Sequence, residues 1–211
     1  MDGVKQAERM ASRQQREPRT KRGRLTRQRI LDAAAVEFGE KGFHDTSIVA
    51  ITQRAGVALG SFYTYFASKQ ELFEALVEHL SNGVRDAVGP AIAGVDDPIE
   101  REGEALAAFL GFVSDHREIY RIIDEAEFVA PQAWRRHYTS TAKRIEERIM
   151  QASDEPGREI GEVEAWAIMG MNVFLGLRSV LLDGAADAPA DISQRVMRIL
   201  RSGLSGSAPS P

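Results

Sequence analysis

Three hydroxyl side chains follow a glycine turn in the first third of the chain, in a pattern that suits hydrogen bonding to a nucleic acid. Ser61, Tyr63 and Thr64 come shortly after Gly56. Hydroxyl groups donate and accept hydrogen bonds, so they can contact base edges or phosphate oxygens, and the Thr64 methyl can meet a thymine methyl. Gly60 lacks a side chain and lets the backbone approach a groove closely. The chemistry that this pattern indicates is recognition and not bond cleavage.

Two short helices must position these hydroxyl groups. The sequence predicts them over residues 47–54 and 59–66, with Ser47 as the first N-cap and Ala55-Gly56-Val57 as the turn between them. Ile51, Ala55, Val57 and Phe62 then point inward and hold the helices at a fixed angle. This is the pattern of a helix-turn-helix, about residues 47–66, whose second helix enters a major groove. Its outer face would carry Leu59, Gly60, Ser61, Tyr63 and Thr64.

Apolar spacing predicts an all-α fold around this motif. A helix over residues 26–41, capped by Thr26 and ended by Gly42, precedes it, and a helix capped by Ser68 and running to about residue 88 follows it. Gly89-Pro90 is a predicted break. Further helices are expected over residues 98–114, 117–128, 131–152, 158–183 and 190–204.

Charge is distributed unevenly along the 211 residues. Residues 1–70 carry 13 Lys and Arg against 7 Asp and Glu, a net charge of +6, whereas residues 71–211 carry 14 against 24, a net charge of −10. A basic N-terminal segment followed by an acidic remainder is typical of a DNA-binding module fused to a second domain. The chain has no cysteine, which excludes disulfides and cysteine-ligated metals.

Catalytic and membrane functions find little support in the sequence. The four histidines (His44, His79, His116 and His137) are scattered, and there is no phosphate-binding loop and no cluster of metal ligands. We therefore expect no enzyme activity, no cofactor and no metal. No apolar stretch approaches the ~18 residues of a membrane span, and the N-terminus lacks the apolar core of a secretory signal. A cytoplasmic protein is expected.

Residues 24–83 resemble the tetracycline-repressor (TetR) family of regulators. The ordered set of matching residues is Phe38, Gly42-Phe43, Thr46-Ser47, Ile51, Ala55-Gly56-Val57, Gly60, Phe62-Tyr63-Thr64-Tyr65-Phe66, Lys69 and Leu72-Phe73. The resemblance implies that Ser47 donates to a DNA phosphate and that Tyr65 and Lys69 clamp backbone phosphates. It also implies that Leu59, Gly60, Ser61, Tyr63 and Thr64 form the recognition surface.

Two residues depart from the family pattern. The residue after Ala55-Gly56-Val57 is usually serine, and Ala58 stands there instead, so the recognition helix lacks a cap worth about 1 kcal/mol. Thr52 replaces the usual alanine after Ile51, and its hydroxyl can bond back to a helix carbonyl. Neither change abolishes the fold, but both make the operator sequence harder to infer.

The resemblance and the composition together divide the chain into four parts. Residues 1–23 are expected to be a disordered basic arm, 24–83 the DNA-binding domain, 84–204 a helical ligand-binding and dimerisation domain, and 205–211 a disordered tail. Large side chains that could line a ligand pocket, or could simply fill the core, are Phe109, Phe112, Tyr120, Ile123, Phe128, Trp134, Tyr138, Trp166, Met169 and Phe174.

The expected function is therefore that of a transcription regulator, and specifically a ligand-responsive repressor. Its partners would be a palindromic double-stranded DNA operator, a bulky apolar effector such as a fatty acid or an acyl-CoA, and a second copy of the chain. The dimer would form through residues 163–182 and the last helix, with Ile192, Val196, Ile199 and Leu200 as apolar contacts. The alternative is a DNA-binding architectural protein, or a regulator without a small-molecule effector.

Overall fold

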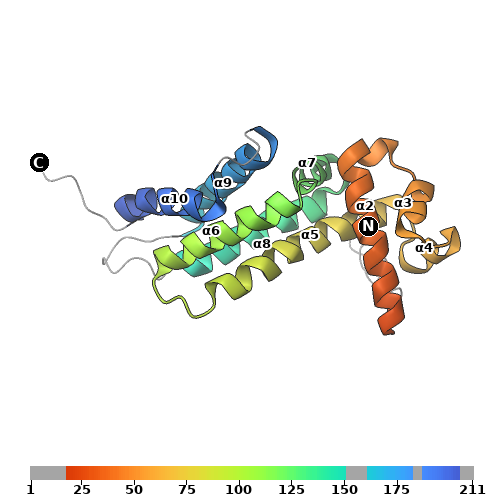
Figure 1. The fold of residues 1–211 in the computed structure, drawn as a ribbon, viewed down its shortest axis with the longest axis horizontal. Helices are drawn as coiled ribbons and strands as arrows, with labels where there is room; N and C mark the ends of the chain where they lie inside the picture. The colour runs from red at the N-terminus through yellow and green to blue at the C-terminus, as the bar shows by residue number, and fades with distance from the viewer. Residues whose placement is uncertain (1–17, 151–160, 183–186, 205–211) are drawn as a thin grey trace, which may run out of the picture. The chain divides into compact units, whose positions relative to one another are not determined.

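The structure is a computed structural model that describes residues 18–150, 161–182 and 187–204, and all regular structure in these ranges is helical, as the sequence predicts (Figure 1). The helices are α2 (Lys21–Asp45), α3 (Ile48–Ala55), α4 (Leu59–Tyr65), α5 (Lys69–Ile92), α6 (Pro98–Asp115), α7 (Ile119–Val129), α8 (Pro131–Ile149), α9 (Glu162–Leu177), followed directly by a π-helix (Arg178–Leu182), and α10 (Pro189–Leu204). No described helix is both long and apolar enough to cross a bilayer.

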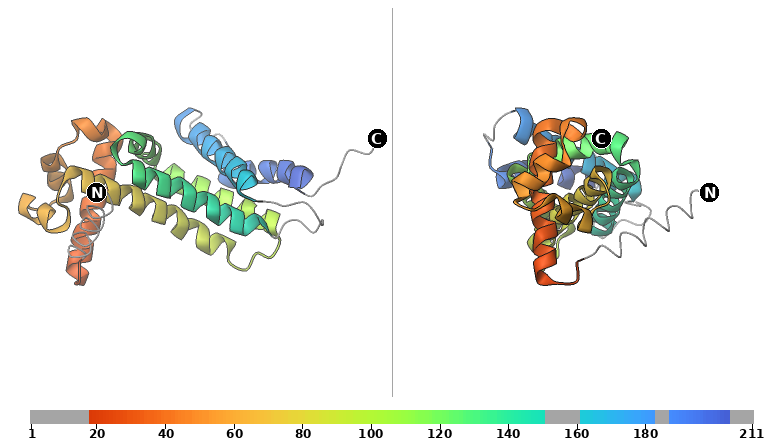
Figure 2. Two further views of the ribbon diagram at one scale, coloured as in Figure 1. Left: turned by 180° about the vertical axis from the view of Figure 1, so that it is seen from behind. Right: turned by 90° about the vertical axis from the view of Figure 1, so that its right-hand side faces the viewer.

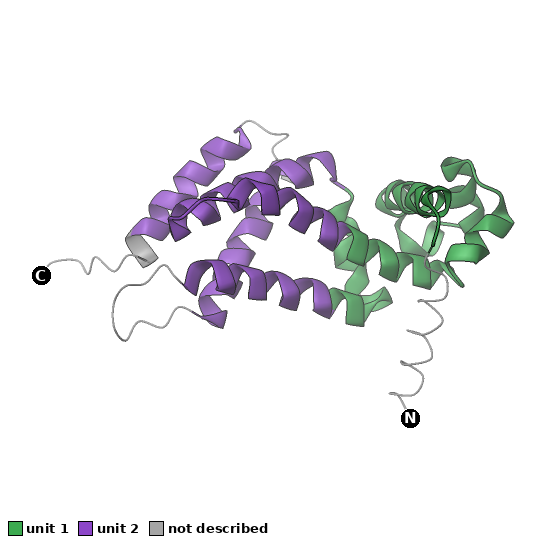
Figure 3. Cartoon of the chain, turned by 90° about the horizontal axis from the view of Figure 1, so that it is seen from below, with its two compact units in different colours: residues 1–79, 118–134 green, residues 80–117, 135–211 purple. Residues whose placement is uncertain are grey.

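The chain forms two compact units (Figure 3). Unit 1 comprises the described residues up to 79 together with residues 118–134, and unit 2 comprises residues 80–117 and the described residues from 135 onward. The first boundary between the units follows residue 79, whereas the sequence placed the end of the DNA-binding domain at residue 83. Helix α7, however, was predicted to belong to the ligand-binding domain and is instead part of unit 1, because it packs against α2.

The core of unit 1 explains why its short helices hold their places. The apolar side chains with no exposed surface come from five helices: Ile30, Leu31, Ala34 and Phe38 of α2, Ile51 of α3, Phe62 of α4, Leu72, Phe73, Leu76 and Val77 of α5, and Ile122 and Ala126 of α7. Figure 2 shows the ribbons of these helices from two further sides. The rings of Phe38 and Phe73 meet edge to face at 5.1 Å between centroids. Aromatic burial of this kind dominates the stability of a small core.

Helix α2 begins earlier than predicted. Thr20, not Thr26, is its N-cap, and the Thr20 Oγ1 accepts a hydrogen bond of 3.1 Å from the Gly23 N–H. Thr26 lies inside the helix and donates to the Arg22 carbonyl at 3.0 Å. Residues 21–23 therefore belong to a helix and not to the predicted arm. The rest of that arm up to residue 17, and the predicted tail 205–211, lie outside the described residues.

Glycine and proline act differently at two predicted helix ends. Gly42 has φ 81°, a conformation that other residues resist, and it interrupts α2 as predicted. The predicted break at Gly89-Pro90 is wrong, because α5 continues to Ile92. Pro90 lies in the last turn of α5, where its missing N–H removes a single hydrogen bond. The chain leaves the helical conformation at Gly94, which has φ 77°.

In unit 2, helix α10 packs tightly on α6. The Ser193 hydroxyl donates to the Gly103 carbonyl at 2.6 Å, and a Cβ on Gly103 would lie 2.9 Å from the Met197 Cγ. Ile192 and Val196 are buried against α6. Leu200 packs against the same cluster, so three of the four apolar residues predicted as dimer contacts on this helix are used within the protomer, because α6 offers a complementary apolar surface.

Candidate nucleic-acid interface

The turn between α3 and α4 is closed by a left-handed glycine. Gly56 has φ 62° and ψ 42°, its N–H donates to the Gln53 carbonyl at 3.1 Å, and the Val57 N–H donates to the Thr52 carbonyl at 3.0 Å. These bonds satisfy the free carbonyls at the end of α3. The Arg29 guanidinium donates to the Ala55 and Gly56 carbonyls at 2.5 and 3.3 Å. Sequence reasoning missed Arg29, since nothing in its local pattern distinguishes it from the other basic residues of α2.

Helix α4 presents an open outer face. Phe62 has no exposed surface, whereas the side chains of Leu59 and Tyr63 are 46% and 52% exposed. A Cβ on Gly60 would meet nothing within 4 Å. Thr64 is also exposed, and Ser61 is half-buried at the edge of this face. The predicted recognition surface thus lies on the exposed side of α4, and exposed apolar and aromatic side chains on so short a helix are available to a groove.

The start of α4 lacks a side-chain cap. Ala58 has the extended backbone of an N-cap residue, with φ −67° and ψ 146°, but no side-chain oxygen. The Ser61 N–H donates instead to the Ala58 carbonyl at 2.9 Å. The missing cap that the sequence predicted is therefore confirmed. The other departure also behaves as expected, because the buried Thr52 hydroxyl donates to the Val49 carbonyl at 3.0 Å.

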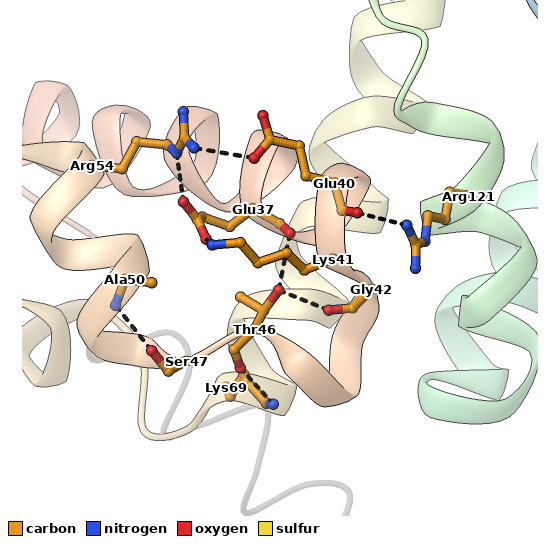
Figure 4. A network of polar contacts seen from close by, with 10 residues as sticks. All are labelled: Glu37, Glu40, Lys41, Gly42, Thr46, Ser47, Ala50, Arg54, Lys69 and Arg121. Carbon is orange, nitrogen blue, oxygen red and sulfur yellow. Dashed lines mark hydrogen bonds and ion pairs between the residues drawn. The ribbon is translucent and has the colours of Figure 1, made fainter.

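A buried carboxylate joins α2 to α3 (Figure 4). Glu37 is 3% exposed and accepts hydrogen bonds of 2.7 Å from the Lys41 ammonium and from Arg54 Nε. These two bonds, that of Lys41 first, lower the pKa of Glu37. The Thr46 hydroxyl donates to the Glu37 and Gly42 carbonyls at 3.0 and 2.7 Å. The network fixes the chain that leads into Ser47.

Ser47 combines two roles at the start of α3. Its Oγ accepts a hydrogen bond of 3.1 Å from the Ala50 N–H, as an N-cap does (Figure 4). The hydroxyl proton is not used by that bond, and the side chain is exposed. A serine hydroxyl can accept one hydrogen bond while donating another. The geometry is therefore compatible with donation to a DNA phosphate.

Lys69, the predicted phosphate clamp, binds backbone carbonyls in the structure. Its ammonium donates to three backbone carbonyls, those of Phe43, Thr46 and His44, at 2.6, 2.8 and 3.2 Å. It also lies 4.5 Å from the Phe43 ring centroid. An ammonium has three hydrogens, so all of them are engaged. The carbonyls lie just after the break of α2 at Gly42, which explains why they need a donor.

Tyr65 and the beginning of α2 lie close together. A Cβ on Gly23 would be 3.6 Å from the Tyr65 hydroxyl oxygen. Lys21, Arg22 and Arg24 occupy the first turns of α2 and are exposed. The phenol therefore lies beside a cluster of cations, in surroundings that suit an anionic backbone. Lys21 and Arg22 were expected on the arm, and the structure places them on a helix, which holds their spacing.

Comparison with known proteins agrees with this geometry. The sequence profile of the bacterial regulatory proteins of the tetR family matches residues 30–76, which run from α2 into α5. Over 195 residues the chain is 28% identical to the helix-turn-helix transcriptional regulator YdgC of Bacillus subtilis, covering 87% of this chain and 94% of that protein. The chain belongs to the TetR family of transcriptional regulators. It is thus a DNA-binding regulator and not an enzyme.

Solved structures support the same assignment. A TetR-like transcriptional regulator from Rhodococcus sp. RHA1 is similar with a TM-score of 0.67 and 27% identity, covering 86% of this regulator and 97% of that chain. The regulator FadR of Bacillus subtilis, solved in complex with stearoyl-CoA, is similar with a TM-score of 0.70 and 18% identity, covering 83% and 98%. The second similarity concerns the fold alone.

Helix α7 of this regulator holds the broken end of α2. The Arg121 guanidinium donates to the Glu40 and Gly39 carbonyls at 2.9 and 3.2 Å. Glu125 accepts a hydrogen bond of 2.6 Å from the Phe43 N–H. These bonds satisfy backbone groups that the kink at Gly42 leaves without helical partners. Sequence reasoning missed this contact, because it joins residues about eighty positions apart.

The predicted ligand-lining residues do not form a single group. Tyr120, Ile123, Phe128 and Trp134 belong to unit 1, where Ile123 is buried and Phe128 is 82% exposed. The other six belong to unit 2. Among these, Tyr138 packs against the cluster that contains Met169, and its ring stacks on Trp166 at 6.4 Å between centroids.

The remaining three residues of unit 2 are separated from that group. Phe109 packs on the cluster formed by α6 and α10. The Phe112 ring lies 4.4 Å from the His116 ring. Phe174 is 70% exposed. Tyr138, Trp166 and Met169 are thus the predicted residues that the structure brings together. Within the described ranges, no group of three His, Asp or Glu side chains could hold a metal ion.

Proposed function

We propose that this regulator is an operator-specific repressor whose base contacts come from the outer face of α4. The observation that carries the proposal is the contrast within that helix between buried Phe62 and the exposed surface of Leu59, Gly60, Tyr63 and Thr64. The buried ring fixes the helix, and the open face is free to enter a major groove. Ser61 would contact DNA from the edge of this face.

Phosphate contacts would flank this recognition helix. Ser47 has a free hydroxyl proton at the start of α3, and the Tyr65 phenol lies beside the basic first turns of α2. Both are suited to donate to phosphate oxygens, which position a protein on the duplex without reading sequence. Lys69 contributes indirectly, because its three carbonyl contacts hold residues 43–46 ahead of Ser47.

The regulator would act as a homodimer on a palindromic operator. Helix α9 carries a stripe of exposed or open positions at helical spacing: Val163, Ala167, Gly170 and Phe174. Val163 and Phe174 are 76% and 70% exposed, and a Cβ on Gly170 would meet nothing within 4 Å. An apolar stripe with a small residue at its centre suits close packing of two copies of α9. Ile199, 66% exposed on α10, would extend the contact.

The effector would be a molecule with a long apolar chain, a fatty acid or an acyl-CoA, whose binding releases the operator. The group formed by Tyr138, Trp166 and Met169 supports an apolar ligand in unit 2. A protein of the same fold has been solved with stearoyl-CoA, which supplies the first compounds to test. A ligand that binds one dimer conformation better than another shifts the population and thereby the DNA affinity.

Fluorescence anisotropy with the palindromic DNA upstream of the regulator's own gene tests the proposal. We expect tight, salt-sensitive binding by the wild type and at least about tenfold weaker binding by Tyr63→Ala, since a base or phosphate contact is worth about 1–3 kcal/mol. Phe128→Ala removes an exposed aromatic ring from α7 and should leave binding unchanged. Lauroyl-CoA or laurate should release the DNA. Operator affinity unaffected by any ligand would favour a ligand-independent or architectural protein instead.

A further inference from the structure

Helix α8 carries a polar stripe that the proposed function does not use. His137, Thr141, Arg144 and Arg148 follow one another at helical spacing, beside the apolar stripe Tyr138, Ala142, Ile145 and Ile149. All four polar side chains are partly buried, whereas the outer residues of the helix, such as Ser140 and Lys143, are exposed. From the sequence this stripe is indistinguishable from a solvated face. The structure turns it toward α5 and α6, which lie alongside α8 (Figures 1 and 2).

Both ends of the polar stripe have partners on these helices. The His137 Nδ1 and the Ser81 hydroxyl of α5 lie 2.6 Å apart. Arg148 Nε donates at 2.8 Å to Glu102 of α6, whose side chain is 2% exposed. Asn172 of α9 donates to the same carboxylate at 3.3 Å. The charge of Arg148 is therefore compensated inside unit 2, as a buried ion pair requires.

Arg144, at the centre of the stripe, has no such compensation. Its one hydrogen bond runs from Nη2 to the Thr141 hydroxyl at 3.0 Å, and no ion pair joins it to a carboxylate within residues 18–150, 161–182 and 187–204. Burial, followed by the nearby charges of Arg148 and Arg85, lowers the pKa of Arg144. Glu147 opposes this effect only in part. A partly buried cation repelled by two others is an unfavourable arrangement that an anion would relieve.

A second group in the same network also lacks a partner. The Oδ1 atom of Asn172 is fully buried and has no hydrogen bond among the described residues, although its Nδ2 binds Glu102. A buried acceptor without a donor costs about 1–3 kcal/mol. Arg144, which has no anionic partner, is thus one turn of α8 away from Arg148. Arg148 belongs to the network with Glu102 and Asn172, in which the Asn172 Oδ1 has no donor. Such unsatisfied groups call for a specific explanation.

We propose that unit 2 binds an amphipathic anion, whose carboxylate or phosphate pairs with Arg144. This rests on the proposed sensing of a long-chain ligand and specifies its chemistry. A guanidinium matches both carboxylate and phosphate geometry, so the shared requirement is an oxyanion joined to an apolar chain.

Calorimetric titration of the full chain with laurate, lauroyl-CoA and dodecanol tests the proposal. The three probes share one saturated chain and differ in the head group. At least one of the two anions should bind the wild type about tenfold or more tightly than dodecanol. Arg144→Met should weaken that anion by about 10- to 100-fold and leave dodecanol unchanged, the loss expected of one charged hydrogen-bonded pair. Lys143→Met removes a neighbouring exposed charge and should change nothing.

The pattern of losses identifies the anionic group. If Arg144→Met weakens laurate selectively, a carboxylate occupies the site, and if it weakens lauroyl-CoA selectively, a phosphate does. Dodecanol binding the wild type as tightly as both anions would overturn the anion site but leave an apolar effector in place. The three wild-type affinities decide this even if Arg144→Met does not fold. Binding of none of the three would overturn ligand sensing as well, and operator binding would be unaffected by that result.

Discussion

Replacing Lys69 with methionine separates two roles that the same side chain could have at a DNA interface. In the structure its ammonium donates to three carbonyls, with two short bonds of 2.6 and 2.8 Å and one longer bond of 3.2 Å. A net hydrogen bond contributes about 1 kcal/mol, and water can reach part of this site, so the two short bonds predict a loss of about 2 kcal/mol in the free energy of unfolding. For a chain of this size that corresponds to a fall in Tm of about 4–8 °C.

The assay combines urea unfolding with the salt dependence of operator binding. A residue that neutralises one phosphate contributes about 0.9 to the slope of log affinity against log salt. If Lys69 holds the backbone, Lys69→Met destabilises the fold and leaves that slope unchanged. Lys69→Arg should recover stability only in part, because a planar fork cannot direct donors at three carbonyls as an ammonium does. Unchanged stability together with a slope lowered by about 0.9 would refute this reasoning.

Three further predictions follow from single contacts. Ala58→Ser should supply the missing N-cap of α4 and raise the free energy of unfolding by about 1 kcal/mol. Ala67→Ser, which fills no cap position of α4, should not raise it. Equal effects of the two substitutions in denaturant titrations would contradict the capping argument. Burial, and then the charge of Arg144, lower the pKa of His137 to about 4, so its ring stays neutral in the fold while the unfolded chain binds a proton near pH 6.5. The free energy of unfolding then falls as the pH is lowered from 6.5 to 4, by at most about 3 kcal/mol. His137→Gln should flatten this acid part of the stability curve, whereas His44→Gln should not. An NMR titration giving an ordinary pKa for His137 would disprove the prediction. Finally, Phe174→Asp should shift the dimer to monomer in analytical ultracentrifugation, because it puts a charge on the exposed stripe of α9. Phe128→Asp, on α7, should leave the dimer intact. A Phe174→Asp dimer as tight as that of the wild type would mean that the interface lies elsewhere.

The helix-turn-helix could be predicted because its signals are local. Ser47 as a cap, Gly56 in the left-handed conformation and buried Phe62 follow from residue type and spacing within one short segment. The start of α2 was misplaced because Thr20 and Thr26 are equally good caps by type, and only the structure shows which one accepts the Gly23 N–H. Local signals thus fix the presence of a helix better than its first residue.

Contacts between distant residues could not be predicted in the same way. Arg121 and Glu125 read as a charged face of an amphipathic helix, yet they bind backbone groups at the break of α2, which is why α7 belongs to unit 1. In the same way, the sequence does not reveal that the polar stripe of α8 has partners on α5 and α6. Lys69 matches a family position, but its partners in the structure are carbonyls that follow the kink at Gly42. Each of these depends on long-range packing that spacing does not encode.

Selection of DNA from a random-sequence pool tests the central claim most directly, because it can recover an operator of any sequence. The account predicts enrichment of a palindrome with half-sites separated by whole helical turns. Tyr63→Ala should bind the selected DNA at least about tenfold more weakly, and Phe128→Ala as well as wild type. Failure to enrich any sequence, or full binding by Tyr63→Ala together with Thr64→Ala, would contradict recognition through the outer face of α4.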